Sequence, residues 1–281
     1  MLSINTNLNA SNASTQIANS QKAVNTASER LTTGLRINKA GDDVAGMGLA
    51  TRLEKSSTQT AQYMENAANG VSLIQTADAA IKQQQELVAR MQELAYQAEN
   101  GTNSAKDIEL INKEFEQLGK ELHRNTKSVE YNGTKLLDGS LDASIAVGEG
   151  TANQVGVKVG ASTEKVKIVD ANGDMVLKLT DARADADAWK TDVHDVLQGF
   201  QDELTGQRAD LGAAQNRLEF TTQNLQSYKQ NIDSSLSLTK DADYAAETTN
   251  LAKAKVLKSA SQSMLSQANQ SMEEVVQKLL R

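Results

Sequence analysis

The chain of 281 residues contains no cysteine and no proline. Without cysteine it can form neither a disulfide nor a thiolate metal site. Because proline breaks a helix in its interior, the absence of proline suits long uninterrupted helices. Aromatic residues make up 3% of the chain, too few for a core rich in aromatic side chains. These absences favour a helical protein with an aliphatic core.

Residues that could support catalysis are also scarce. The chain has two histidines, His123 and His194, and no His-Glu-x-x-His metalloprotease motif. His194 has aspartates close by but no nucleophile motif, so we expect it to occupy an exposed position on a helix. We expect Asp42 or Asp43 to cap the following helix, and we do not expect this pair to bind a metal ion. The sequence therefore predicts no enzyme, no catalytic residue, no metal and no cofactor.

The charge pattern excludes other classes of protein. A net charge of -7 argues against nucleic-acid binding, which normally needs a basic face. No apolar run approaches the roughly 18 residues of a membrane span. Residues 1–21 carry no charge and lack the features of a cleavable signal peptide. We therefore expect neither nucleic acid nor a membrane as a partner, and export, if any, without a cleaved signal.

An unbroken heptad pattern follows later in the chain. Its first row is Leu197, Leu204, Leu211, Leu218, Leu225 and Ile232, and its second row is Phe200, Gln207, Ala214, Thr221, Tyr228 and Ser235. An apolar residue at every seventh position is typical of a long helix that packs along a seam. Similar spacing predicts two further helices, over residues 44–99 and 105–128. The second of them stops near Asn132-Gly133. These three segments would form an intramolecular three-helix bundle.

Weaker apolar stripes occur at the two ends of the chain. The stripe near the N-terminus includes Ile17, Val24 and Leu31, with small residues such as Ser20 and Ala27 in its second row. The stripe near the C-terminus includes Leu257, Leu265, Met272, Val275 and Leu279. Each is too narrow to offset the chain entropy of a helix alone. We expect the two segments to form a pair that is stable only together, or only within an assembly.

Between the helical segments, apolar residues alternate with small or polar ones. The alternation of Ile145, Val147, Val155, Val157 and Val159 predicts one short hairpin. A second is expected over residues 161–185, around the turn Asn172-Gly173. The predicted fold is mainly α, with long antiparallel helical rods, formed by a terminal helix pair and a three-helix bundle, and a small β-hairpin region.

Several motifs resemble those of bacterial flagellins. Residues 30–38 read RLTTGLRIN, residues 66–72 read NAANGVS, and residues 210–217 read DLGAAQNR. Towards the C-terminus, DADYA at 241–245 and QANQ at 267–270 also resemble that family. The motifs occur in the family's order and cover nearly the whole chain, except about residues 160–190. The sequence is therefore identified as that of a short flagellin.

The resemblance implies a structural subunit that polymerises into a helical flagellar filament for motility. It implies that residues 1–40 and 240–281 form the filament core and polymerise through the eight larger stripe residues named above. Residues 41–160 and 186–239 would form the rod bundle. Residues 161–185 would stand in place of an outer domain. It also implies secretion by the flagellar type III pathway, an export chaperone, a filament cap protein and hook-associated junction proteins as partners, and extracellular localisation.

The resemblance further implies contact with a vertebrate innate immune receptor. The positions that match the family's contact motif are Arg90, Leu94 and Glu114. Gln92 departs from the arginine that family members often carry there.

Two alternatives to the filament subunit remain at this point. A hook-filament junction protein shares the terminal segments of flagellins, although the match at residues 210–217 and at the C-terminus favours the filament subunit. A cytoplasmic coiled-coil module would form a soluble oligomer of fixed size instead of an open polymer.

Overall fold

The computed structural model describes residues 7–150, 152–160, 168, 176–179 and 193–279. Five long helices run through the described residues: α1 (Leu8–Thr33), α2 (Val44–Glu99), α3 (Ala105–Ser128), α7 (Asp195–Lys240) and α8 (Tyr244–Leu279). The chain divides into two compact units, which are described separately. The terminal unit comprises Met1–Thr58 and Gln230–Arg281, and the central unit comprises Gln59–Lys229.

Side chains at the helix ends explain where several helices begin and end. The Asn7 side chain accepts a hydrogen bond from the Ala10 backbone N–H at 3.0 Å and so caps α1. Gly34 ends the same helix with a φ of 73°, a left-handed conformation that favours glycine. Ser104 and Asp107 form a reciprocal capping box at the start of α3.

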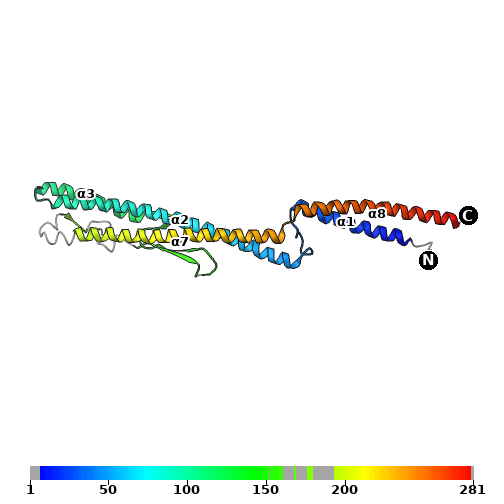
Figure 1. Ribbon diagram of the computed structural model, residues 1–281. Coiled ribbons are helices and arrows are strands. Elements are labelled where there is room, and N and C mark those ends of the chain that lie inside the picture. The colour runs from blue at the N-terminus through cyan, green and yellow to red at the C-terminus, as the bar shows by residue number, and fades with distance from the viewer. Residues whose placement is uncertain (1–6, 151, 161–167, 169–175, 180–192, 280–281) are drawn as a thin grey trace. The chain divides into compact units, whose positions relative to one another are not determined.

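The core of the central unit lies among α2, α3 and α7, which run side by side in Figure 1. From α2, Ile74, Ile81 and Val88 are each no more than 1% exposed. Phe115 of α3 and Phe200 of α7 are fully buried in the same cluster. This confirms the expected intramolecular bundle and places two of the few aromatic residues at its centre.

An ion pair ties two helices of the bundle together at their surface. The Arg208 guanidinium on α7 contacts the Asp78 carboxylate on α2, with Nε 2.7 Å from Oδ1, and donates to Gln85 Oε1 at 3.0 Å. The hydrogen bonds to Asp78 are the chief cause of the raised pKa of Arg208. The pair orients α7 on α2 beside the apolar seam.

Two small antiparallel strand pairs accompany the bundle. Strands β3 (Asp142–Ala146) and β4 (Gln154–Lys158) form the expected first hairpin, in which Ala143 pairs with Val157. The hairpin docks where Gly70 of α2 leaves room for the Ile145 side chain. A Cβ at position 70 would collide with Ile145, so the absence of a side chain permits this contact.

The other strand pair was not expected. Strands β1 (Glu130–Tyr131) and β2 (Thr134–Lys135) flank Asn132-Gly133, and both turn residues have positive φ. The helix predicted over residues 105–128 is α3, which ends at Ser128, just before this strand pair. The predicted second hairpin, around Asn172-Gly173, lies mostly outside the described residues.

The terminal unit contains α1 and α8, which lie side by side in Figure 1, together with the first residues of α2 and the last residues of α7. Antiparallel bridging between Leu35 and Asp241 joins the two connecting segments. The expected pairing of the terminal helices is therefore present.

Candidate polymerisation surface

Helices α1 and α8 meet through small side chains. Ser20 and Ala27 of α1 are 4% and 3% exposed, and Ala254 and Ser261 of α8 are 5% and 9% exposed. Small residues at a helix contact allow close approach of the backbones but bury little apolar area. The two helices are thus held together by a seam that contributes little hydrophobic stabilisation.

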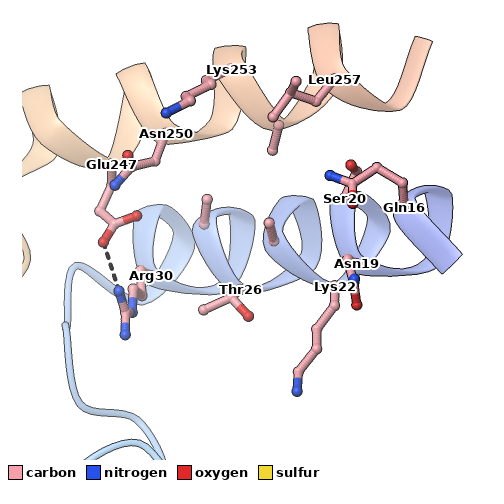
Figure 2. A pocket seen from close by; sticks show the side chains of 13 residues that line it. Gln16, Asn19, Ser20, Lys22, Thr26, Arg30, Glu247, Asn250, Lys253 and Leu257 are labelled. Atoms are coloured by element: carbon pink, nitrogen blue, oxygen red, sulfur yellow. Dashed lines mark hydrogen bonds and ion pairs between the residues drawn. The ribbon is translucent and has the colours of Figure 1, made fainter. Parts of the chain in front are cut away.

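An open groove runs along this seam. One cavity of about 520 Å³ is lined by α1 residues such as Ala23 and by Leu257 of α8, and Figure 2 shows its walls. A second cavity, of about 490 Å³, lies between Ala13 on α1 and Met264 on α8, and Leu257 also lines it. The Ser20 hydroxyl lines the first cavity and has no hydrogen-bond partner among the described residues. The groove therefore presents apolar and polar surface that the two helices do not fill.

One ion pair closes the end of the groove. The Arg30 guanidinium of α1 donates to the Glu247 carboxylate of α8 at 2.9 Å, drawn as a dashed line in Figure 2. The Glu247 side chain is 10% exposed, so this carboxylate is largely removed from water. A mostly buried carboxylate depends on its partner, because breaking such a pair leaves an uncompensated charge.

Of the expected polymerisation residues with described side chains, Leu257 lines both cavities, and the other five are not among the lining residues. Ile17, Val24 and Leu31 of α1 are half-buried, as are Leu265 and Met272 of α8, while Leu257 is 42% exposed. The side chains of Val275 and Leu279 lie outside the described part of the structure. The larger members of the stripes are thus only partly covered by the partner helix.

The residues that make the tightest α1–α8 contact were absent from the expected site. Ser20, Ala27, Ala254 and Ser261 belong to the same stripes but are small. Selection by side-chain size missed them, although their three-four spacing contained the signal. The small residues are buried where the two helices meet. The larger residues are only partly covered, so part of their surface is left for other contacts.

Hydrogen bonds fix the segment between α1 and α2 against the end of α7. The Arg36 backbone N–H donates to the Lys240 carbonyl at 2.7 Å, and the Ala242 N–H donates to the Gly34 carbonyl at 2.9 Å. The Ile37 side chain is 1% exposed. The segment between α1 and α2 and the segment between α7 and α8 are therefore hydrogen-bonded to each other.

The two neighbouring aspartates hold this segment. The Asp42 carboxylate accepts hydrogen bonds from the backbone N–H groups of Lys39 and Asn38, which lower the pKa of Asp42. The Asp43 carboxylate accepts from the Gly46 N–H at 2.9 Å and caps α2. The expectation of helix capping is confirmed for Asp43, whereas Asp42 stabilises the turn.

The structure brings two of the three expected receptor residues together on the surface. The exposed Arg90 guanidinium of α2 contacts Glu114 of α3 at 2.8 Å and Glu93 at 2.9 Å. Hydrogen bonds to Glu93 and Glu114 raise the pKa of Arg90. Leu94 lies beneath them in the core, with an exposed fraction of 1%.

The sequence-based placement of His194 was wrong. Its side chain is 15% exposed, its ring lies 4.4 Å from that of Tyr96, and Nε2 is 3.6 Å from the Glu99 carboxylate. The periodicity could not reveal this, because the end of α2 supplies the covering residues. Among the described residues, no group of acidic or histidine side chains could hold a metal ion. No helix in the described part of the chain is long and apolar enough to span a membrane.

The long helices, the terminal pair and the open groove together define a helical structural protein. Residues 4–142 match the family model for the bacterial flagellin N-terminal helical region, and residues 195–280 match that for the bacterial flagellin C-terminal helical region. The chain therefore belongs to the bacterial flagellins, the structural subunits of flagellar filaments.

Similar proteins agree with this assignment along the whole chain. A flagellin of Halalkalibacterium halodurans is 34% identical over 280 residues, which cover 98% of this chain and 99% of the relative. A flagellin of Bacillus subtilis is also 34% identical, over 301 aligned positions, with the same shares covered. A solved structure of a putative flagellar hook-associated protein from Vibrio parahaemolyticus covers 71% of this chain and 99% of its own, with a TM-score of 0.60 and 14% identity. That last likeness shows a shared fold.

Proposed function

We propose that this flagellin polymerises through α1 and α8, and that residues 1–40 and 240–281 form the core of the extracellular flagellar filament. The observation that supports this proposal is the groove between the two helices, which is incompletely filled and lined by the exposed apolar side chains of Leu257 and Met264. Burial of such surface by neighbouring copies would supply the hydrophobic stabilisation that the small-residue seam lacks.

The rest of the chain would form the other parts of the subunit. In this proposal, residues 41–160 and 186–239 make up the rod bundle with its hairpin, because most residues of the continuous apolar core lie in the described parts of these ranges. The second hairpin expected over residues 161–185, in place of an outer domain, falls mostly outside the described residues. A subunit of this kind builds an open helical polymer when its contacts are heterologous and do not close into a ring.

A buried charge in the seam tests the role of the helix pair. Ala27→Glu places a carboxylate where the side chain is 3% exposed and should destabilise the α1–α8 pair by about 3 kcal/mol or more. We expect the variant to retain the circular dichroism and melting of the central unit but to form no filaments when seeded with parent fragments.

The matched control is Ala18→Glu, which makes the same substitution at an exposed position of α1. Electron microscopy and sedimentation should show filaments for this control. Deletion of residues 1–30 should abolish filaments like Ala27→Glu does. Normal filaments from the deleted chain would rule out polymerisation through the terminal pair.

The filament subunit is favoured over the two alternatives. The alignments to two flagellins cover 98% of the chain at 34% identity, whereas the likeness to a hook-associated protein is one of fold. A cytoplasmic coiled-coil module would use the α7 seam for oligomerisation, but α2 and α3 of the same chain cover much of it.

Export and assembly partners follow from the proposed filament. The chain would leave the cell by the flagellar type III pathway, and a helical chain without cysteine or proline suits refolding after passage. An export chaperone and a filament cap protein are two further proposed partners. Membership of the flagellin family also implies other flagellar components, such as hook-associated proteins, as partners.

A vertebrate innate immune receptor is proposed as a further partner, because Arg90 and Glu114 form one exposed polar patch. The Leu94 side chain would support this patch from the core. Arg90→Ala removes the guanidinium and should reduce receptor signalling by about tenfold or more. A reporter-cell assay measures this, with Lys113→Ala on the exposed face of α3 as control. Equal signalling by Arg90→Ala and the parent would exclude the patch.

A further inference from the structure

One methionine of the terminal unit differs from the others in its exposure to solvent. The chain has seven methionines, of which Met1 and Met175 lie outside the described residues. Four of the other five are buried or half-buried: Met47, Met64, Met91 and Met272. Met264 of α8 is 65% exposed. Because the backbone of a helix is covered by its own side chains, this exposure belongs to the thioether side chain.

The exposed methionine lies in the groove between α1 and α8. Met264 lines the second cavity and follows Leu257 by about two helical turns on the same side of α8. Among the described residues that line this cavity there is no charged side chain, and Leu257 and Met264 are the apolar ones larger than alanine. Met264 therefore supplies much of the apolar surface in this part of the groove.

A thioether differs from the other apolar groups of the groove because a peroxide can oxidise it. The Met264 sulfur takes one oxygen atom from hydrogen peroxide, the O–O bond breaks, and the remaining oxygen leaves as water. The sulfur loses two electrons and the peroxide gains them. The product is a sulfoxide, which is polar and chiral where the thioether was apolar and flexible. At Met264 this reaction needs no movement of the helix, because solvent already reaches the side chain.

We propose that Met264 is an oxidation site that controls assembly: its conversion to the sulfoxide by a peroxide keeps the subunit out of the filament. Burial of the groove by neighbouring copies stabilises an apolar thioether, but it removes water from a sulfoxide oxygen, and burial of a polar group without a partner is unfavourable. The same burial protects the thioether of an assembled subunit from the oxidant. The inference rests on the proposed polymerisation through α1 and α8.

The rate of oxidation at each methionine tests the first part of this proposal. Peptide mass spectrometry after brief treatment of the full-length monomer with hydrogen peroxide measures these rates. Met264 should react at least about tenfold faster than the fully buried Met91. In filaments the rate at Met264 should fall to about a tenth of its rate in the monomer or less. Equal rates at Met264 in monomer and filament, or a rate in the monomer below that of the half-buried Met64, would overturn the proposal.

A competition within the parent chain tests the effect on assembly. Partly oxidised monomer is seeded with untreated filament fragments, and the pellet and supernatant are compared after sedimentation. The Met264 sulfoxide should be depleted from the pellet at least about tenfold relative to the supernatant, because the groove is buried there. The sulfoxide of Met64, in the central unit, should be shared equally and serves as the internal control. Equal sharing of the Met264 sulfoxide would contradict the proposed control of assembly.

A substitution that cannot form a sulfoxide assigns the effect to one side chain. For each chain, the critical concentration for seeded polymerisation after peroxide treatment is divided by its value before treatment. This ratio should be about ten or more for the parent and for the matched control Met64→Leu, but about one for Met264→Leu. Methionine sulfoxide reductase should return the treated parent to its starting value. A ratio for Met264→Leu as large as the parent's would overturn the proposal, and the competition, which needs no variant, decides if Met264→Leu assembles poorly.

The outcomes distinguish this inference from the proposed function. If Ala27→Glu forms no filaments while the Met264 sulfoxide enters filaments freely, the terminal pair keeps its role and the oxidation site is wrong. If Ala27→Glu forms normal filaments, polymerisation through the terminal pair fails, and control of assembly at Met264 fails with it. A parent chain that forms no filament overturns both.

Discussion

Single side chains decide how the chain passes from α1 to α2. Gly46 lies in the first turn of α2, directly beside the residues that end the connecting segment. A Cβ at this position would lie 2.6 Å from Ile37 Cδ1 and closer still to the Asp43 carboxylate, which caps the helix. The φ of Gly46 is not in the left-handed region, so the backbone conformation does not require glycine. The close packing around this position does.

Two nearby glycines of α2 allow a matched prediction. Gly46→Ala should lower the free energy of unfolding of the terminal unit by about 1–3 kcal/mol, because the new methyl group displaces the cap or Ile37. Gly48→Ala meets open space and should raise helix stability by about 0.5–1 kcal/mol. Amide hydrogen exchange over residues 37–50 measures both. The packing argument fails if the two substitutions shift exchange in the same direction.

At the scale of the elements, the bundle contains a buried polar contact within its apolar core. The Gln84 side chain of α2 is fully buried and donates from Nε2 to Thr126 Oγ1 of α3 at 3.0 Å. Within the described part of the chain, Gln84 Oε1 and Asn125 Oδ1 have no hydrogen-bond partner. A buried amide with an unsatisfied oxygen costs free energy that an apolar side chain of similar volume would not.

This contact leads to a prediction about stability. Gln84→Leu should raise the free energy of unfolding of the central unit by about 1 kcal/mol, because it removes the unsatisfied oxygen and keeps the volume. Gln84→Ala should lower it by about 2 kcal/mol, because it leaves a cavity. Urea denaturation followed by circular dichroism gives both values. If leucine destabilised the bundle as much as alanine does, Gln84 would contribute more than the packing of its stem.

The helices themselves were accessible to sequence reasoning, whereas the small elements were not. The apolar spacing of α3 predicted one face made of Ile108, Ile111, Phe115, Leu118 and Leu122. Leu118 is half-buried and the other four are buried. The two-residue strands β1 and β2 have no detectable period, so only their turn at Asn132-Gly133 was visible. His194 was misplaced because its cover comes from Tyr96, nearly a hundred residues away.

For the whole molecule, the two units differ in what stabilises them. The central unit has a continuous core of leucine, isoleucine, valine and phenylalanine side chains. The terminal unit joins α1 and α8 mainly through small residues, beside an unfilled groove. Since hydrophobic stabilisation scales with buried apolar area, α1 and α8 should open more readily than the central unit in the monomer.

Limited proteolysis tests this difference. Trypsin should cleave the purified monomer first at Lys22 or Arg30 in α1, or at Lys253, Lys255 or Lys258 in α8, and leave a resistant central fragment. Polymerisation should protect the same sites, because neighbouring copies would cover the groove. Mass spectrometry of the fragments identifies the order of cleavage. Equal cleavage of monomer and filament at α1 and α8 would contradict the expected gain in order.

The sequence alone determined that this protein is built from long helices, where most of them lie, and to which family it belongs. Those properties depend on local spacing, on the absence of proline and on motifs that are read in chain order. Only the tertiary structure decided which surfaces are covered. The α7 row from Leu197 to Leu218 is core, while Tyr228, in the adjoining row, is exposed. A heptad pattern specifies which face of a helix is apolar. Because the hydrophobic effect has no preferred direction, the pattern does not specify which side chains will cover that face.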